Sequence, residues 1–260
     1  MADPQDRGAT IPGTFSAVNY GDASRIATPA DHERARMIME HRKFAYKGML
    51  AIRAASALAG QIYAEHGLEA AMDLASSVPE EDYLHDYLPN APILYNDIDP
   101  FVIAWSRQLL GDRPNIAYTN EDVRNIQQIL AVAAQHFGAA RRIGVHATGL
   151  WYFIESDEEI QAITQATFDF AAPGSLKTVT GWDDPGDQGT TAIKKGYQQS
   201  GQTLYPRSAA QITELMRPWQ PYQGGLMPTE QFFRQHGRYR QLDTEENQNK
   251  IGFAGLFIRP

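Results

Sequence analysis

From residue 68 onward, short apolar runs alternate with helix-forming segments, and this alternation restricts the fold more than any other feature of the chain. Strands are predicted near 70–74, 92–96, 115–119, 142–148 and 175–180, and helices near 80–88, 100–110, 123–136 and 157–170. Alternation of this kind produces a parallel sheet with right-handed crossover connections. The apolar run 251–258 is predicted to form a closing strand. The sequence therefore predicts an α/β domain.

Three helix starts carry residues that can cap the first turn. Asp99 lies directly before a proline, and Ser156 and Ser208 stand three residues before Glu159 and Gln211. A carboxylate or hydroxyl at this position accepts a hydrogen bond from an unpaired backbone N–H of the first turn. These residues therefore fix the starts of three predicted helices.

The region before residue 67 differs in character from the alternating part. Residues 1–14 are rich in Pro, Gly, Asp and Thr and are predicted to form a disordered tail. Residues 15–66 are rich in helix-forming residues and are predicted to form a helical lid over the open end of the sheet. A break is expected near Gly48 or Gly60, because one helix of that length would be unusual. Residues 67–260 then form the α/β domain.

A carboxylate follows each of two predicted strands. Asp97 comes directly after the apolar run 93–96, and Asp73 ends the strand one βα unit earlier. A carboxylate at the tip of a parallel strand can accept hydrogen bonds from both hydroxyls of a ribose, worth roughly 1.5–3 kcal/mol each. Nucleotide-binding α/β domains place such an acid about 20 residues after the first strand's turn. The spacing therefore predicts an adenosine-bearing cofactor.

Composition excludes several classes of function. The 260 residues carry a formal net charge of −8, which argues against a nucleic-acid partner because phosphate binding needs a basic surface. The absence of cysteine excludes disulfides and thiolate metal sites and is typical of a cytoplasmic protein. No metal site is expected from the spacing of the seven histidines. The sequence has no long apolar span, so no membrane association is expected.

A series of short motifs follows the predicted strands in a fixed order. They are Asp73-Leu74-Ala75-Ser76-Ser77, Tyr95-x-Asp97-x-Asp99-Pro100, Asn120-Glu121-Asp122-Val123-Arg124, Ala172-Pro173-Gly174-Ser175 and Arg207-Ser208, with His41-Arg42-Lys43-Phe44 ahead of the first strand. In this order the motifs resemble class I S-adenosylmethionine-dependent methyltransferases. More narrowly, they are similar to the bacterial S-adenosyl methyltransferase family, long known only as a domain of unknown function.

The resemblance implies a Rossmann-like, seven-stranded, mostly parallel sheet with an antiparallel final strand, and S-adenosyl-L-methionine as methyl donor or substrate. It assigns cofactor binding to Asp73, Ala75, Ser77, Asp97, Ile98, Asp122, Val123 and Arg42. Asp73 and the following turn would face the methionine part, and Asp97 would hold the ribose. Ile98 and Val123 would pack on the adenine ring, while Asp122 would accept from its amino group.

The resemblance also implies a methyl-transfer chamber after the fourth strand. Tyr152, Trp151, His146 and Tyr20 are the catalytic candidates. Aromatic faces near a sulfonium stabilise its charge by cation–π attraction, about 0.5–2 kcal/mol. His146 is a candidate base for a hydroxyl nucleophile.

The chain departs from the family pattern in the first loop, where Ala75 and Ser77 replace glycines. Glycine readily adopts positive φ, whereas Ala and Ser resist it and add a Cβ next to the ligand. The expected consequences are a shifted cofactor pose, weaker binding or altered chemistry.

Three functions stay open on the sequence. The first is a methyltransferase acting on a small molecule, in secondary metabolism. The second is an enzyme that cyclises the aminobutyrate arm of the cofactor to azetidine-2-carboxylate and releases methylthioadenosine. The third is a non-catalytic binding protein of the same fold. The sequence leaves the acceptor, the modified atom and the oligomeric state undetermined.

Overall fold

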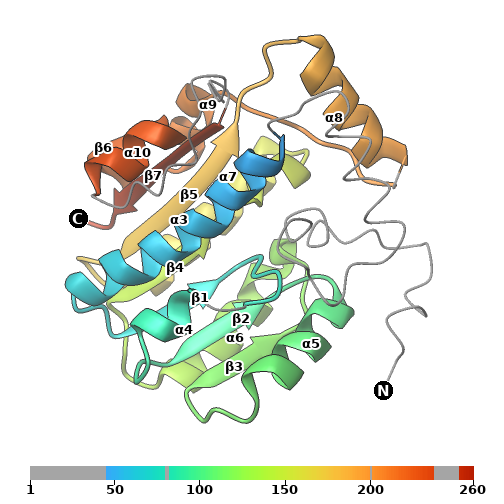
Figure 1. The fold of residues 1–260 in the computed structure, drawn as a ribbon. Helices are drawn as coiled ribbons and strands as arrows, with labels where there is room; N and C mark the ends of the chain where they lie inside the picture. The colour runs from blue at the N-terminus through green and yellow to red at the C-terminus, as the bar shows by residue number, and fades with distance from the viewer. Residues whose placement is uncertain (1–44, 80–81, 200, 237–251) are drawn as a thin grey trace.

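A computed structural model of the chain describes residues 45–79, 82–199, 201–236 and 252–260 (Figure 1). Its centre is a seven-stranded sheet of order β3-β2-β1-β4-β5-β7-β6. The strands are β1 (Ala70–Asp73), β2 (Ile93–Asn96), β3 (Ile116–Thr119), β4 (Ile143–Ala147), β5 (Leu176–Trp182), β6 (Gln220–Pro228) and β7 (Gly252–Ile258). Strands β1 to β5 pair in parallel, and β7 runs antiparallel to both β5 and β6. The predicted α/β class and the mostly parallel, seven-stranded sheet are confirmed.

Helices cover both faces of the sheet. They are α3 (Ala45–Glu65), α4 (Leu84–Tyr87), α5 (Pro100–Leu110), α6 (Ile126–Phe137), α7 (Asp157–Phe170), α8 (Gln188–Gln199), α9 (Ala209–Leu215) and α10 (Thr229–Gln235). Helices α6, α7 and α9 share one apolar core with one face of the sheet. Helices α3, α4 and α10, with the end of α5, form a second core on the other face. The fold therefore has three layers.

Helix α3 is continuous and lies across β4 and β5 (Figure 1). The expected break near Gly48 or Gly60 is therefore wrong. Gly60 is instead a contact point with α4, because a Cβ at this position would lie 2.8 Å from Tyr87 Cδ2. Leu58 and Ile62 of the same helix are buried in the second core. Helix α3 is thus a covering layer of the sheet.

The remaining parts of the N-terminal region lie outside the described residues. These are the tail predicted for 1–14 and the stretch 15–44 of the predicted lid. The three-part division of the chain, including the lid, therefore stays a prediction.

Three elements of the C-terminal half, α8, β6 and α10, were not predicted from the sequence. Strand β6 contains Pro221 and the pair Gly224-Gly225, both glycines at positive φ, and its register with β7 shifts between Tyr222 and Met227. Proline and glycine weaken a strand pattern and mark an irregular edge strand, which explains why β6 was missed.

Two of the predicted helix caps are confirmed: Asp99 caps α5 and Ser208 caps α9. The backbone N–H of Ser208 also donates to the side chain of Gln211.

The sheet topology fixes where a ligand can bind. Strand order reverses between β1 and β4, because the chain builds β2 and β3 on one side of β1 and β4 and β5 on the other. Parallel sheets of this type bind ligands in the crevice at the carboxyl ends of the strands at such a switch point. Among the described helices, none is long and apolar enough to cross a bilayer.

Candidate functional site

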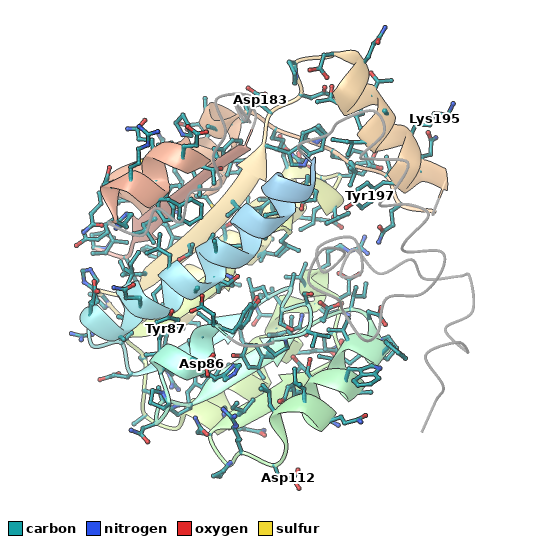
Figure 2. The ribbon with its side chains drawn as sticks, viewed as in Figure 1. Asp86, Tyr87, Asp112, Asp183, Lys195 and Tyr197 are labelled. Carbon is teal, nitrogen blue, oxygen red and sulfur yellow. The ribbon has the colours of Figure 1, made fainter. Side chains whose placement is uncertain are left out.

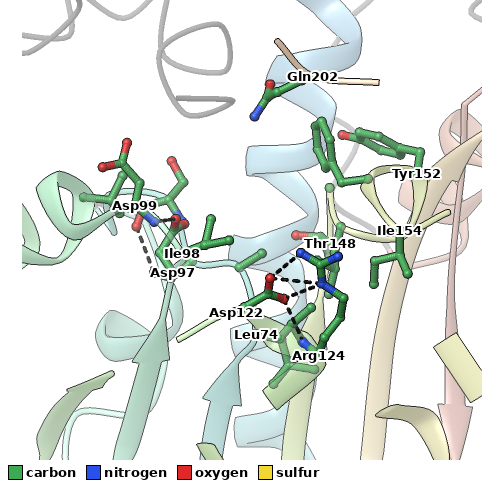
Figure 3. A pocket seen from close by; sticks show the side chains of 18 of the residues that line it. Leu74, Asp97, Ile98, Asp99, Asp122, Arg124, Thr148, Tyr152, Ile154 and Gln202 are labelled. Carbon is green, nitrogen blue, oxygen red and sulfur yellow. Dashed lines mark hydrogen bonds and ion pairs between the residues drawn. The ribbon is translucent and has the colours of Figure 1, made fainter. Parts of the chain in front are cut away.

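A cavity of about 640 Å³ opens at the carboxyl ends of β1 to β4. Asp97 and Ile98, which follow β2, line one side, and Tyr152 and Ile154, which follow β4, line the opposite side (Figure 3). Asp122 lies between the two sides. The cavity is thus polar and acidic at one end and aromatic at the other.

Asp97 is held in a fixed orientation at the cavity wall. Its Oδ2 accepts from Ser77 N at 2.9 Å and its Oδ1 accepts from Asp99 N at 2.9 Å. Two backbone donors therefore orient the carboxylate. Next to it, Ile98 leaves 60% of its side chain exposed, which is unusual for a large apolar residue. The pair offers a charged acceptor beside an apolar surface, as its predicted ribose and adenine roles require.

Ser77, at a position where the resemblance implies glycine, adopts a backbone conformation that favours glycine. Its φ is 53°, in the left-handed region, so a serine here does take positive φ, contrary to the sequence-based expectation. This conformation costs a residue with a Cβ roughly 1–2 kcal/mol. The N–H of Ser77 can then reach Asp97. Within the described residues its Oγ is buried and has no hydrogen-bond partner.

Asp73 lies beneath the cavity and does not line it. Its carboxyl group is fully buried at the end of β1, where Oδ1 accepts from Ala75 N at 3.3 Å and Oδ2 lies 2.9 Å from Tyr83 Oη. Burial raises the pKa of Asp73 to about 8, against the smaller lowering effect of these hydrogen bonds. Ala75, Ser76, Ser77 and Tyr83 separate it from the cavity, and all four line the wall. Asp73 therefore lies one layer below the residues that line the cavity.

His146 also lies beneath the surface, which corrects its expected place in the chamber. It sits in the middle of the sheet on β4 and is fully buried, with Nε2 2.8 Å from Ser56 Oγ and 2.9 Å from Thr148 Oγ1. Ser56 and Thr148 line the cavity in its place. Burial lowers the pKa of His146 to about 3, so this imidazole is a weak base.

Asp122 and Arg124 form a closed ion pair at the centre of the cavity (Figure 3). Asp122 accepts from Arg124 N and Nε at 2.9 Å and also contacts Nη2, and these bonds lower the pKa of Asp122. Arg124 thus already binds both carboxylate oxygens of Asp122, so Arg124 must move before Asp122 can accept from an adenine amino group. Val123, the residue between them in the sequence, is buried and lines the cavity, and its packing on an adenine ring stays a prediction.

The aromatic end of the cavity is built on the short 3₁₀ turn η3 (Trp151–Phe153). The Tyr152 and Phe153 ring centroids lie 4.6 Å apart, and Trp182 lies 6.0 Å from Tyr152. Tyr197 of α8 packs on Phe153 from above and is buried, while Lys195 of the same helix points to solvent (Figure 2). Tyr152 and Phe153 line the cavity, and Trp182 and Tyr197 pack against these two rings without lining it. The four rings are called the aromatic wall below.

Trp151 belongs to the core and not to the aromatic wall, contrary to expectation. Its ring is 1% exposed and lies 5.2 Å from Lys177 Nζ, which also lies 5.4 Å from the ring of Trp219. The fully buried Lys177 also donates to Thr167 Oγ1 at 3.2 Å. Large rings after an apolar strand fit a core as well as a chamber, so the sequence alone did not separate the two.

Arg207 anchors the aromatic wall and was not assigned a role from the sequence. Its guanidinium donates to the carbonyl oxygens of Trp151, Ile154, Glu155 and Tyr205. Its Nε also donates to Asp157 Oδ1 at 2.6 Å. The planar fork of donors therefore fixes the loop that follows η3. The quoted Arg-Ser motif was the signal that could have revealed it.

Asn96 is a second residue that the sequence analysis missed. It ends β2, where its Nδ2 donates to the carbonyls of Leu74 and Glu121 at 3.0 and 3.1 Å. Its Oδ1 accepts from Thr119 Oγ1 and Glu121 N. One buried amide thus ties together the carboxyl ends of β1, β2 and β3. A polar residue closing an apolar strand was the available signal.

Two further candidates, Tyr20 and Arg42, lie outside the described residues, so their assigned roles stay predictions. In the described part of the chain, no group of three His, Asp or Glu side chains is arranged to hold a metal ion.

A family model described as S-adenosyl methyltransferase matches residues 24–260, which is most of the chain. The chain belongs to the S-adenosyl methyltransferase family. S-adenosyl-L-methionine is therefore its cofactor, as the sequence predicted. No curated protein matches the sequence.

Several solved structures of other proteins are similar to this chain in fold. A DUF574 family protein from Streptomyces avermitilis MA-4680 is 15% identical, with a TM-score of 0.85 over 96% of this chain and 98% of its own. A candidate methyltransferase from Thermobifida fusca YX is 20% identical, with a TM-score of 0.80 over 96% and 95%. The N-methyltransferase NodS from Bradyrhizobium japonicum WM9, in complex with S-adenosyl-L-homocysteine, is 12% identical, with a TM-score of 0.51 over 96% and 100%. At these identities the likeness confirms the fold alone.

The cavity fits S-adenosyl-L-methionine in shape and chemistry. The volume suits a ligand of this size. The oriented Asp97 matches a pair of ribose hydroxyls, and the exposed Ile98 matches a purine ring. The turn formed by Ala75, Ser76 and Ser77 brings backbone close to the cavity.

Proposed function

We propose that the protein is a methyltransferase that transfers the methyl group of S-adenosylmethionine to a small molecule bound against the aromatic wall. One observation carries the proposal: a single cavity joins the acid and apolar pair Asp97-Ile98 to the ring of Tyr152. A nucleoside held at the first end would direct the other end of the cofactor toward the second. The reacting groups would then meet inside one enclosed space.

At the cofactor end, we assign the ribose hydroxyls to Asp97 and the adenine ring to Ile98 and Val123. The support is that Asp97 is held by two backbone N–H groups and that both apolar side chains line the same wall. The turn 75–77 is assigned to the methionine part. The expectation of a weak or shifted pose applies here, because Ser77 carries a Cβ where the family has none.

The charges that line the cavity as a whole favour a neutral or cationic acceptor over an anionic one. The described residues that line the cavity include six carboxylates, Asp97, Asp99, Glu121, Asp122, Glu155 and Glu159, and a single cation, Arg124. Asp122 neutralises Arg124. An acceptor carrying a carboxylate or phosphate would therefore meet uncompensated negative charge. The aromatic wall adds an apolar surface on which a flat acceptor can pack.

Rate acceleration would come mainly from positioning. Bound S-adenosylmethionine supplies a methyl group that is already activated by the sulfonium. The chain's part is to hold the acceptor in line with that group and to exclude water, an effect of order 7–11 kcal/mol in well-oriented systems. The face of Tyr152 would stabilise nearby positive charge. His146 is buried and only weakly basic, so the proposal assigns it no proton.

The deciding experiment is incubation with S-adenosylmethionine and a panel of neutral, basic and acidic aromatic compounds, followed by mass spectrometry. S-adenosylhomocysteine together with a methylated acceptor is the expected result. Methylthioadenosine formed without any acceptor would instead support cyclisation of the aminobutyrate arm. Binding without either product would support a non-catalytic protein. The placement in secondary metabolism stays a prediction that the identity of the acceptor would test.

A further inference from the structure

Among the described residues, the buried carboxyl group of Asp73 has no cationic partner. The titratable groups that face it come from every element packed around it: Tyr63 of α3, Tyr83 before α4, Tyr95 of β2, Asp97 after β2 and His146 of β4. Within the described part of the chain, no lysine or arginine pairs with it. His146 Nε2 is 4.0 Å from Asp73 Oδ2, but burial keeps that imidazole neutral. A buried carboxylate in such surroundings would carry an uncompensated charge.

The hydrogen bonds of Tyr83 show where a proton is needed. The Tyr83 hydroxyl lies 2.9 Å from Asp73 Oδ2 and 2.8 Å from the carbonyl oxygen of Ser76. A carbonyl oxygen can only accept, and a hydroxyl has one proton to donate. Both contacts become hydrogen bonds at the same time if Tyr83 donates to Ser76 and a protonated Asp73 donates to Tyr83. The geometry therefore favours the neutral acid.

We propose that Asp73 is protonated before ligand binding and loses its proton when S-adenosylmethionine binds, so that it selects the charged sulfonium over the uncharged thioether of the product. This inference rests on the proposed function and deepens it. Asp73 does not touch the ligand. It acts as a specificity-determining residue across the wall formed by Ala75, Ser76 and Tyr83.

The physical basis is the charge of the occupant. A nearby cation lowers an acid's pKa by roughly 1 to 3. For a carboxyl group whose pKa burial has raised to about 8, that change moves ionisation through neutral pH. S-adenosylhomocysteine has no sulfonium, so it leaves the proton in place. The product is then held less tightly than the substrate. Because Asp73 must give up its proton when S-adenosylmethionine binds, this preference is largest near and above pH 8 and shrinks as the pH falls.

The test is isothermal titration calorimetry of the full chain at pH 7 in phosphate and in Tris, two buffers that differ in ionisation enthalpy. With S-adenosylmethionine we expect the release of up to one proton per site, and with S-adenosylhomocysteine close to none. Up to tenfold more affinity for S-adenosylmethionine per pH unit is expected between pH 6 and 8, in proportion to the proton released.

The matched variant is Asp73→Asn, whose amide keeps the shape of the protonated acid and a donor toward Tyr83. It is expected to remove the extra proton release, and comparing it with the wild type cancels the ligand's own ionisation. A thermal melt checks that the variant folds. The wild type alone gives a second readout: the infrared C=O band of a protonated carboxyl group should disappear on addition of S-adenosylmethionine.

The outcomes separate the two proposals. S-adenosylmethionine binding with equal proton release in wild type and Asp73→Asn, or with an unchanged infrared band, would overturn this inference alone. No heat with either nucleoside would overturn the proposed function and this inference together.

Discussion

The backbone N–H of Ser77 donates to Asp97 Oδ2 over 2.9 Å, which joins the turn after β1 to the turn after β2. This bond exists because Ser77 takes a φ of 53°. The two residues that the family resemblance places around one cofactor are therefore coupled before any cofactor is present. A change in either residue is expected to affect the other.

Ser77→Gly is expected to stabilise the protein. Glycine removes the penalty of roughly 1–2 kcal/mol for left-handed backbone, but it also raises the conformational entropy of the unfolded chain, which offsets part of this gain. The net stabilisation is about 1 kcal/mol. For a chain of this length that gain raises the Tm by about 2–4 °C. Ser76→Gly is the control, because the buried Ser76 hydroxyl donates to the carbonyl of Ser77 and its loss should lower the Tm. A lower Tm for Ser77→Gly would contradict the assigned strain.

Asp97→Ala is expected to weaken the binding of S-adenosylmethionine by at least tenfold. The change removes a charged acceptor worth roughly 1.5–3 kcal/mol per hydrogen bond, and also releases the N–H groups of Ser77 and Asp99. Calorimetric titration measures the loss. Asp112→Ala, at an exposed position beyond α5 (Figure 2), is the matched control and should bind like the wild type. Equal affinity in both variants would refute the ribose assignment.

Arg207→Lys is expected to loosen the aromatic wall. Lysine cannot replace the planar fork that serves four carbonyls and Asp157, and each buried carbonyl left unpaired costs about 1–3 kcal/mol. We expect a Tm several degrees lower and a larger loss in methyl transfer than in cofactor affinity. Arg217→Lys serves for comparison, because Arg217 is exposed and forms an ion pair with Glu214 on the surface. If both variants behave alike, the anchoring role of Arg207 is wrong.

Lys177→Met is expected to raise the Tm most at and below neutral pH. Burial lowers the pKa of Lys177 to about 7, below its ordinary value of 10.5, so between these values the unfolded chain binds more protons than the folded one. Stability due to this group therefore rises with pH across that window. Methionine fills the space between Trp151 and Trp219 without a charge. The advantage of the variant, at least about 1 kcal/mol at pH 7, should shrink toward pH 10.

Melting curves of both proteins at pH 7 and pH 10 measure this change. Comparing the difference between them removes the effect of all other titrating groups. A constant difference at the two pH values would show that Lys177 keeps an ordinary pKa in the folded protein.

The sheet was predictable because each parallel strand carries its own local signal. The run 93–96 is apolar, bounded by a proline and a carboxylate, and it forms β2 as expected. Strand β6 has no such signal, since Pro221 and the pair Gly224-Gly225 interrupt it. Its existence depends on pairing with β7, a distant segment that no local pattern reveals. The wrongly predicted helix break at Gly60 has a related cause. Gly60 allows close contact with α4, which is a separate segment of the sequence.

The site divides in the same way. Asp97 and Ile98 could be predicted because an acid followed by an exposed apolar side chain has few structural roles at the end of a strand. Whether His146, Trp151 or Tyr152 reaches the cavity depends on which side of the backbone each side chain takes after β4 and on what covers it. Only Tyr152 lines the cavity. Asn96 and Arg207 hold the site through backbone carbonyls. The polar end of β2 and the Arg-Ser motif could have drawn attention to these two residues, but not to the carbonyls that they bind.

Strand β7 lies between β5 and β6, although it follows both in the chain. Among the described strands, β6 pairs only with β7. During synthesis, β6 therefore leaves the ribosome before β7 has been made. The backbone N–H and C=O groups of β6 and the side chain of Met227 stay unpaired with β7 until residues 252–258 follow. The sheet closes only when β7 inserts between β5 and β6, so closure of the sheet comes after every strand that borders the ligand cavity has been made.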